Sequence, residues 1–406
     1  MEYQFHTLAN GIKLVHKQIE TKVAHCGFIV NTGSRDELLF EHGMAHFIEH
    51  VIFKGTKKRK AYHIISRIED VGGELDAYTT KEDTCIYASF LNTYYERTLE
   101  LFSDILFNST FPEKEIQKEK DVIYDEINSY KDSPAELIFD DFEELVFKDH
   151  ALGRNILGTF ESLKYLTKEN LLNFINENYH TDQMVLCSVG NIPFEKLVQL
   201  FEKYYSHIPS NFRNKKRNPF QSYKPNIVRE KKDTFQTHCL IGNEAYKLKD
   251  KRRTQMVLLN NILGGPNMNS RLNLSLREKH GYAYNIESFY NTYEDTGVFG
   301  IYFGTDNGNL EKSLHIIKKE LNILKEKPLG KLQLHKAKQQ LIGQLAIATE
   351  SYSSLMLNIG KSYLLFNKVD TLDEMAAKIE AIDANQIMEA ANEIFDWDKF
   401  SIVIYE

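Results

Sequence analysis

Residues 41–55 read EHGMAHFIEHVIFKG, and apolar side chains recur at positions 44, 47, 48, 51 and 52. This spacing is typical of a helix rather than a strand, and Gly55 suits the end of that helix. Residues four apart stack on one helix face, so His46 and His50 face the same side, one turn apart. Two imidazoles at this spacing, with Glu49 beside the second, indicate part of a zinc site.

A hydrolytic zinc ion takes three protein ligands and keeps one position open for water. His46 and His50 supply two of them. The carboxylate of Glu49 projects beside the metal, where it can accept a proton from a water molecule whose pKa the zinc has lowered. We therefore interpret Glu49 as a general base rather than a ligand. His42 also lies four residues before His46 and offers a different pair, but no acidic residue precedes His46 at the matching place.

The third ligand is expected from a second helix. The segment from Pro112 to about Tyr130 is acidic, has apolar residues at 116, 122, 123 and 127, and begins at a proline that suits a first helical position. Glu119 and Glu126 are seven residues apart in it and share one face, two turns apart. By themselves they would indicate a solvated acidic face.

Together, H-x-x-E-H and the downstream E-x6-E resemble the pitrilysin (insulinase) family of inverted zinc metallopeptidases. The resemblance implies that His46, His50 and Glu126 bind one zinc ion per chain and that Glu49 is the general base. It also implies that Glu119 orients one of the ligands.

A third stretch, residues 264–284, resembles the family's glycine-containing loop followed by an arginine and a tyrosine seven residues apart. By this resemblance Arg277 and Tyr284 hydrogen-bond the substrate carbonyl and stabilise the oxyanion formed when water attacks it. Without the resemblance, Arg277 could be a surface cation and Tyr284 an ordinary strand residue.

The chain has 406 residues, which is long for one core and favours two domains. The sequence is internally similar: TKEDTCIYASFL at 80–91 matches TYEDTGVFGIYF at 292–303, and helical runs follow at 93–107 and 309–325. We predict an α+β fold of two homologous domains, each a mainly antiparallel sheet packed with helices, at 1–209 and 226–406. Residues 210–225, which are polar, basic and broken by two prolines, are predicted to be an exposed linker.

The second copy lacks the histidine motif, since Leu258 stands where His46 stands in the first. The family resemblance implies a clamshell chamber of four such domains, of which this chain supplies two. We therefore expect a homodimer or a heterodimer with a related chain. The resemblance also implies that peptide substrates add a strand to an exposed sheet edge, and residues 75–80, with Asp76, Ala77 and Tyr78, are the candidate edge. An ordinary interior strand is the alternative.

The composition and charge of the chain bear on its possible partners and its compartment. The formal charge of −7 and the lack of stacking aromatics interleaved in the basic cluster at 213–217 argue against a nucleic-acid partner, and we interpret that cluster as solvated linker. No apolar run approaches 18 residues, and the start of the sequence shows no secretion signal, so no membrane partner is expected. Four separated cysteines without a C-x-x-C pair are typical of a reducing compartment. We expect a cytoplasmic protein.

The combined interpretation is a zinc-dependent endopeptidase that acts on peptides or unfolded segments. The alternative is a catalytically silent or partner-dependent subunit of a processing-peptidase-like heterodimer.

Overall fold

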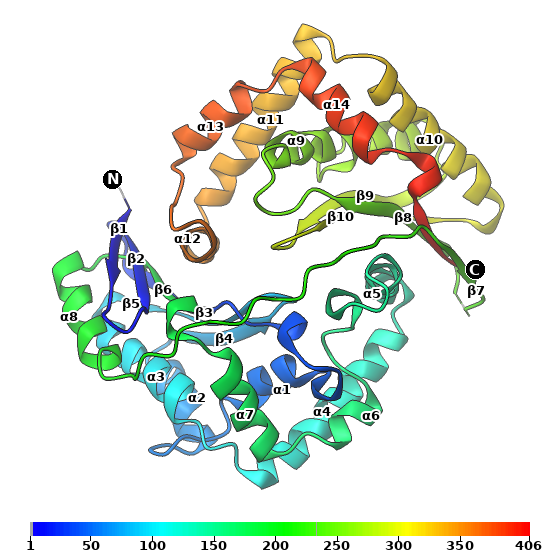
Figure 1. Cartoon of the computed structure of the whole chain (residues 1–406). Helices are drawn as coiled ribbons and strands as arrows, with labels where there is room; N and C mark the ends of the chain where they lie inside the picture. Colours follow the sequence, from blue (N-terminus) through cyan, green and yellow to red (C-terminus); the bar gives the residue numbers. More distant parts are fainter. Residues whose placement is uncertain (1–2, 233) are drawn as a thin grey trace. The chain divides into compact units, whose positions relative to one another are not determined.

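The computed structural model describes residues 3–232 and 234–406 (Figure 1). The chain forms two compact units, and neither is continuous in sequence. Unit 1 comprises residues 1–127, 154–217 and 347–370, and unit 2 comprises residues 128–153, 218–346 and 371–406. These units differ from the contiguous domains 1–209 and 226–406 expected from the sequence, because each includes one helix from the other half of the chain.

Unit 1 contains a six-stranded sheet in the order β1-β2-β6-β3-β5-β4. Its strands are β1 (Gln4–Thr7), β2 (Lys13–Gln18), β3 (Val23–Val30), β4 (Glu74–Thr79), β5 (Thr84–Leu91) and β6 (Met184–Gly190). The described pairs are antiparallel except β2 with β6, which is parallel. The apolar strands β3 and β6 are almost wholly buried and lie in the middle, whereas β4 is at one edge.

The helices of unit 1 pack through apolar stripes. They are α1 (Met44–Val51), α2 (Ala61–Glu69), α3 (Tyr95–Asn108), α4 (Glu113–Lys131, entering unit 2 at its end), α6 (Phe160–Lys164), α7 (Lys168–Asn178), α8 (Phe194–Tyr205) and α12 (Tyr352–Phe366). The helices expected around 41–55, 112–130 and 93–107 correspond to α1, α4 and α3.

Helix α12 comes from the C-terminal half of the sequence but belongs to unit 1 (orange in Figure 1). Its residues Leu355, Met356 and Ile359 share a core with Ile29 of β3 and Cys187 of β6. This core covers the face of the sheet to which alternate side chains of β6 point.

Unit 2 repeats this architecture. Its sheet has the order β7-β11-β8-β10-β9 and consists of β7 (Ile227–Glu230), β8 (Thr237–Ala245), β9 (Ala283–Thr292), β10 (Gly297–Thr305) and β11 (Ser401–Tyr405). Its helices are α5 (Pro134–Val146), α9 (Arg253–Gly264), the π-helix η6 (Asn273–Lys279), α10 (Leu310–Glu326), α11 (Lys331–Thr349, reaching into unit 1), α13 (Leu372–Glu380) and α14 (Ala384–Ile394).

The two faces of this second sheet have separate cores. Ile241 of β8 and Phe299 of β10 pack with α9, α10 and α14, whereas the adjacent Leu240 and Val298 pack on α5. Because side chains alternate across a strand, each face requires its own helical cover, and α5 supplies one from the N-terminal half.

Apart from β1, which has no counterpart among the described strands of unit 2, both sheets have the same connectivity. In unit 1, β3 is antiparallel to β5 and β6, and β2 joins β6 in parallel; in unit 2, β8 is antiparallel to β10 and β11, and β7 joins β11 in parallel. The predicted α+β class with two copies of one fold is confirmed. Short 3-10 helices occur at Ser34–Asp36 (η1), Leu39–Glu41 (η2), Asn92–Tyr94 (η3), Ala151–Gly153 (η4), Thr181–Gln183 (η5), Asn307–Asn309 (η7) and Trp397–Lys399 (η8).

The connection between the halves is mostly exposed, but two of its arginines are held by a carboxylate of unit 1. Arg217 donates to both carboxylate oxygens of Asp36, each at 2.8 Å, and Arg213 donates to Asp36 at 3.2 Å. Only 6% of the Arg217 side chain is exposed. Arg213 and Arg217 are therefore bound to the loop before α1, because Asp36 is a nearly buried anion that needs compensation, whereas Lys215 and Lys216 are exposed. Among the described residues, no helix is both long and apolar enough to cross a membrane.

Candidate metal centre

The N-terminal end of α1 is held by a buried carboxylate. Glu37 accepts hydrogen bonds from the backbone N–H groups of Gly43, at 3.0 Å, and Ala45, at 2.8 Å. Gly43 has φ of 91°, and a Cβ there would lie 2.9 Å from the backbone of Gly158, so this entry to the helix requires glycine. Burial raises the pKa of Glu37 to about 8, while the two N–H donors and the charge of Arg154 act in the opposite direction.

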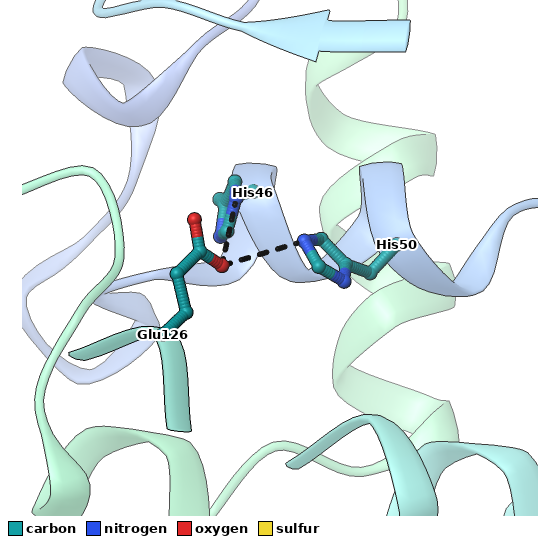
Figure 2. A group of neighbouring side chains, drawn as sticks. All are labelled: His46, His50 and Glu126. Atoms are coloured by element: carbon teal, nitrogen blue, oxygen red, sulfur yellow. Dashed lines mark ion pairs between the residues drawn. The ribbon is translucent and has the colours of Figure 1, made fainter. Parts of the chain in front are cut away.

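Helix α1 presents two imidazole nitrogens to one carboxylate oxygen from α4 (Figure 2). Nε2 of His46 lies 3.8 Å and Nε2 of His50 lies 3.7 Å from Oε2 of Glu126. Both separations are too long for hydrogen bonds. A tetrahedral zinc ion with bonds of about 2.0–2.2 Å holds its ligand atoms about 3.4 Å apart, so the observed spacing is close to that of a ligand set. The three ligand atoms lie within 4.8 Å of one another.

The protonation states favour a metal. Burial, and then the charge of His50, lower the pKa of His46 to about 3, so its imidazole is neutral at ordinary pH. Burial raises the pKa of the Glu126 carboxyl, against the opposing effect of His50. A neutral His46 gives the Glu126 carboxylate no charge to pair with, and a metal cation at this point would compensate it. Two imidazoles and one carboxylate are a donor set that fits zinc, and we conclude that these residues fit that ion.

Glu49 is in the same environment but outside the ligand group. Burial raises its pKa, His50 and the hydroxyl of Thr79 lower it, and the nearby carboxylates of Glu126 and Asp76 raise it again. A carboxyl group with a raised pKa holds a proton more readily, as a general base acting near neutral pH must.

Glu119 contacts His50 at Nδ1, the ring nitrogen that does not face Glu126. Its Oε2 lies 3.3 Å from Nδ1 of His50, and its Oε1 lies 2.8 Å from Nζ of Lys54. A carboxylate that accepts the Nδ1–H of a histidine leaves the Nε2 lone pair free for a metal. This geometry matches the orienting role that the family resemblance implies for Glu119.

His42 points elsewhere. Its Nε2 lies 2.8 Å from the carbonyl oxygen of Asn155, and it is not a member of the ligand group found among the described residues. The alternative pair of His42 and His46 is therefore not assembled.

The candidate substrate strand is β4, which contains Asp76, Ala77 and Tyr78. Among the described strands it pairs with β5 alone. The N–H of Ala77 is donated to Oδ1 of Asp76, at 2.8 Å, rather than to β5. The ring of Tyr78 is covered by Lys361, whose Nζ lies 4.9 Å from its centroid, so the Tyr78 side chain faces the core of unit 1.

Arg277 and Tyr284 lie together in unit 2. The guanidinium carbon of Arg277, in the π-helix η6, is 4.7 Å from the ring centroid of Tyr284, on β9. Both line a cavity of about 620 Å³ with Glu136, Phe139, Met268 and Tyr302. Tyr284 is 72% exposed as a residue, so the pair is accessible to a ligand.

Sequence reasoning missed three residues that support the site. Lys54 could have been found, because it continues the four-residue spacing of His46 and His50. Glu37 and Asp36 carry no comparable signal, since their partners are a helix terminus and arginines far along the chain.

Comparison with known proteins identifies the family of this chain. Residues 13–160 match the family described as insulinase (peptidase family M16), and residues 165–341 match the peptidase M16 inactive domain. A protein of Bacillus subtilis, named uncharacterized zinc protease YmxG, is 33% identical and is aligned over 97% of this chain and 96% of its own length. The mitochondrial-processing peptidase subunit beta of Saccharomyces cerevisiae is 30% identical over 95% of this chain and 87% of its own.

Solved structures show the same fold. A protease from Helicobacter pylori is similar with a TM-score of 0.91 and 22% identity, over 100% of this chain and 99% of that one. A peptidase M16 inactive domain from Pseudomonas fluorescens has a TM-score of 0.92 and 20% identity, over 100% and 98%. The matches of residues 13–160 and 165–341 to the family models, and the relatives that are 30% and 33% identical over nearly the whole chain, show that the chain belongs to the insulinase family of peptidases, family M16.

Proposed function

We propose that this chain is a zinc-dependent endopeptidase that hydrolyses peptides or unfolded segments. The observation that carries the proposal is the convergence of His46, His50 and Glu126 on one point, with Glu49 on the same helix. The names of the relatives, which include several zinc proteases, support zinc as the metal. One ion per chain is proposed because the described residues contain one such ligand group.

The chemistry divides between the metal and the protein. Bound zinc supplies the Lewis acidity that brings the pKa of a water molecule toward about 7. Glu49 accepts the proton of the attacking water and returns it to the leaving amine. Glu119 keeps the ring of His50 in one orientation through the contact at Nδ1.

The substrate is proposed to pair with β4 as an added strand. The N–H of Ala77 is the donor that an extended peptide backbone would use, and main-chain pairing of this kind tolerates many side chains. Arg277 and Tyr284 are proposed to donate hydrogen bonds to the carbonyl oxygen of the bond that is cut, which is supported by their contact and by the exposure of Tyr284.

A second chain is proposed to complete the enzyme, either a copy of this one or a related protein. The support is the resemblance to a relative that is named as the beta subunit of a processing peptidase. Light scattering of the active protein tests this, and a monomer at active concentrations would contradict it. The alternative function, a silent or partner-dependent subunit, is favoured by the match of residues 165–341 to an inactive domain. The complete ligand set and base in unit 1 favour the enzyme.

The activity is tested by incubating the zinc-loaded protein with a mixed library of unstructured peptides. Wild type is compared with Glu49→Gln, which keeps the size of the side chain and the three ligands, and with Glu69→Gln, an exposed glutamate at the end of α2. Loss of a general base typically costs about 10²- to 10⁴-fold in rate, so we expect cleavage by wild type and Glu69→Gln only. Stoichiometric zinc without cleavage by any of them would favour the partner-dependent subunit.

Cytoplasmic localisation stays a prediction. It is supported by the four cysteines, which are all free and buried.

A further inference from the structure

Lys54 connects to the metal site through Glu119. The Nζ of Lys54 lies 2.8 Å from Oε1 of Glu119, and the other oxygen of that carboxylate lies 3.3 Å from Nδ1 of His50. The side chain of Glu119 is only 9% exposed, and that of Lys54 is 27% exposed. The three residues form a chain of charge-assisted contacts that leads from the turn after α1 to a candidate ligand.

The backbone holds Lys54 where this contact is possible. Its N–H is donated to the carbonyl oxygen of Val51, at 3.0 Å, which fixes the turn at the end of α1. The next residue, Gly55, accepts the N–H of Thr110, at 3.0 Å, just before α4 begins. Lys54 therefore lies where the helix that carries both histidines is joined to the segment leading into the helix that carries Glu119 and Glu126.

The ammonium group of Lys54 compensates the charge of the Glu119 carboxylate and limits its rotation. A nearly buried carboxylate is costly unless both its charge and its lone pairs are compensated, and the contact with His50 compensates one oxygen only. Lys54 compensates the other and thereby restricts rotation of the carboxylate. With Glu119 held, the Nδ1–H of His50 has a fixed acceptor, and its Nε2 lone pair points toward His46 and Glu126.

We propose that Lys54 is a positioning residue of the metal centre, acting on His50 through Glu119. The proposal rests on the zinc site of the proposed function. A simple surface ion pair between the turn after α1 and helix α4 would contribute little to folding and nothing to metal binding. Metal affinity therefore separates the two explanations.

The test is the zinc affinity of the full chain, measured at one pH by competition with a chromogenic chelator. We expect Lys54→Met to weaken zinc binding about ten-fold, at the lower end of the range for residues that support a ligand. Lys57→Met is the matched control, because Lys57 is an exposed lysine three residues away, and it should leave the affinity unchanged. Lys54→Gln makes the same comparison should Lys54→Met fail to fold.

A double-mutant cycle tests whether Lys54 acts on zinc binding through Glu119. Glu119→Gln alone should weaken zinc binding by about 10- to 100-fold, and adding Lys54→Met should then change it less than about two-fold. Wild-type affinity in Lys54→Met, or an equal loss with and without Glu119→Gln, would overturn the inference.

The outcome is separable from that of the proposed function. Zinc binding that depends on Lys54 in a protein that cuts no peptide would refute the peptidase alone. Zinc binding that is unchanged in Lys54→Met would refute this inference alone. A wild-type chain that binds no zinc would refute both this inference and the proposed function.

Discussion

Replacement of Gly360 by alanine tests how α12 covers the sheet of unit 1. An added Cβ would lie 2.6 Å from Sγ of Cys187, 2.8 Å from the Cβ of that residue and 2.8 Å from Cδ1 of Ile29. Each distance is shorter than van der Waals contact, and Cys187 and Ile29 are fully buried. Close-packed interiors have no free space for such an atom, so α12 or the sheet must shift.

Two opposing effects set the size of the change. Overpacking a buried contact costs about 1–3 kcal/mol, whereas alanine is favoured over glycine inside a helix by about 1 kcal/mol. The overpacking lies in the upper part of its range here, at about 2–3 kcal/mol, because all three contacts are below 3.0 Å and involve the interior of a sheet. We expect Gly360→Ala to lower the free energy of unfolding of unit 1 by about 1–2 kcal/mol, and its unfolding midpoint by about 2–8 °C.

Scanning calorimetry of the full chain measures the midpoint. Gly343→Ala in α11 is the matched control, because no atom lies within 4 Å of the Cβ it would gain. That variant should be stabilised by about 0.5–1 kcal/mol from helix propensity. The reasoning is refuted if Gly360→Ala is as stable as wild type or if both variants move the midpoint in the same direction.

Three further predictions concern other parts of unit 1. Burial lowers the pKa of His16 to about 4, so folding disfavours protonation of its imidazole. Stability that is present above about pH 6.5 should therefore be lost as the pH falls toward 4, by up to roughly 3 kcal/mol. Urea titrations should show that stability depends less on pH in His16→Gln than in wild type, whereas His63→Gln, an exposed control, should behave as wild type. Arg217→Met should lower the free energy of unfolding in urea by about 1–3 kcal/mol, because it leaves the nearly buried Asp36 with Arg213 as its remaining arginine partner. Adding Asp36→Asn should restore part of the loss. Additive effects of the two substitutions would argue against the pairing. Ala77→Pro removes an N–H that β5 does not use, so peptide turnover should fall while circular dichroism and zinc content are unchanged; unaltered turnover would contradict the added-strand proposal.

The candidate metal centre was largely predictable because its signals are local. His46, Glu49 and His50 lie within one helical turn, and helix periodicity alone places the two imidazoles on one face. The choice of Glu126 as the ligand depended on the family resemblance, since Glu119 lies on the same helix face. The structure separates the two: Glu126 approaches Nε2 of both histidines, whereas Glu119 approaches Nδ1 of His50.

Other features had no local signal. The linker cluster was expected to be solvated because Arg213 and Arg217 are charged, but Asp36, about 180 residues earlier, binds both. Likewise, no local feature of residues 352–366 indicates which sheet face α12 covers.

By itself, the sequence determined the α+β class, the duplication and the histidine motif, because strand alternation, helix periodicity and ligand spacing are properties of neighbouring residues. Tertiary structure alone decided that α12 belongs to unit 1 and α5 to unit 2, that Glu126 rather than Glu119 faces both Nε2 atoms, and that Lys54 reaches Glu119. The physical reason is that burial of a sheet face and compensation of a buried charge depend on groups that the chain brings together only on folding. Those partners are far apart in sequence, and their spacing carries no period that could be read in advance.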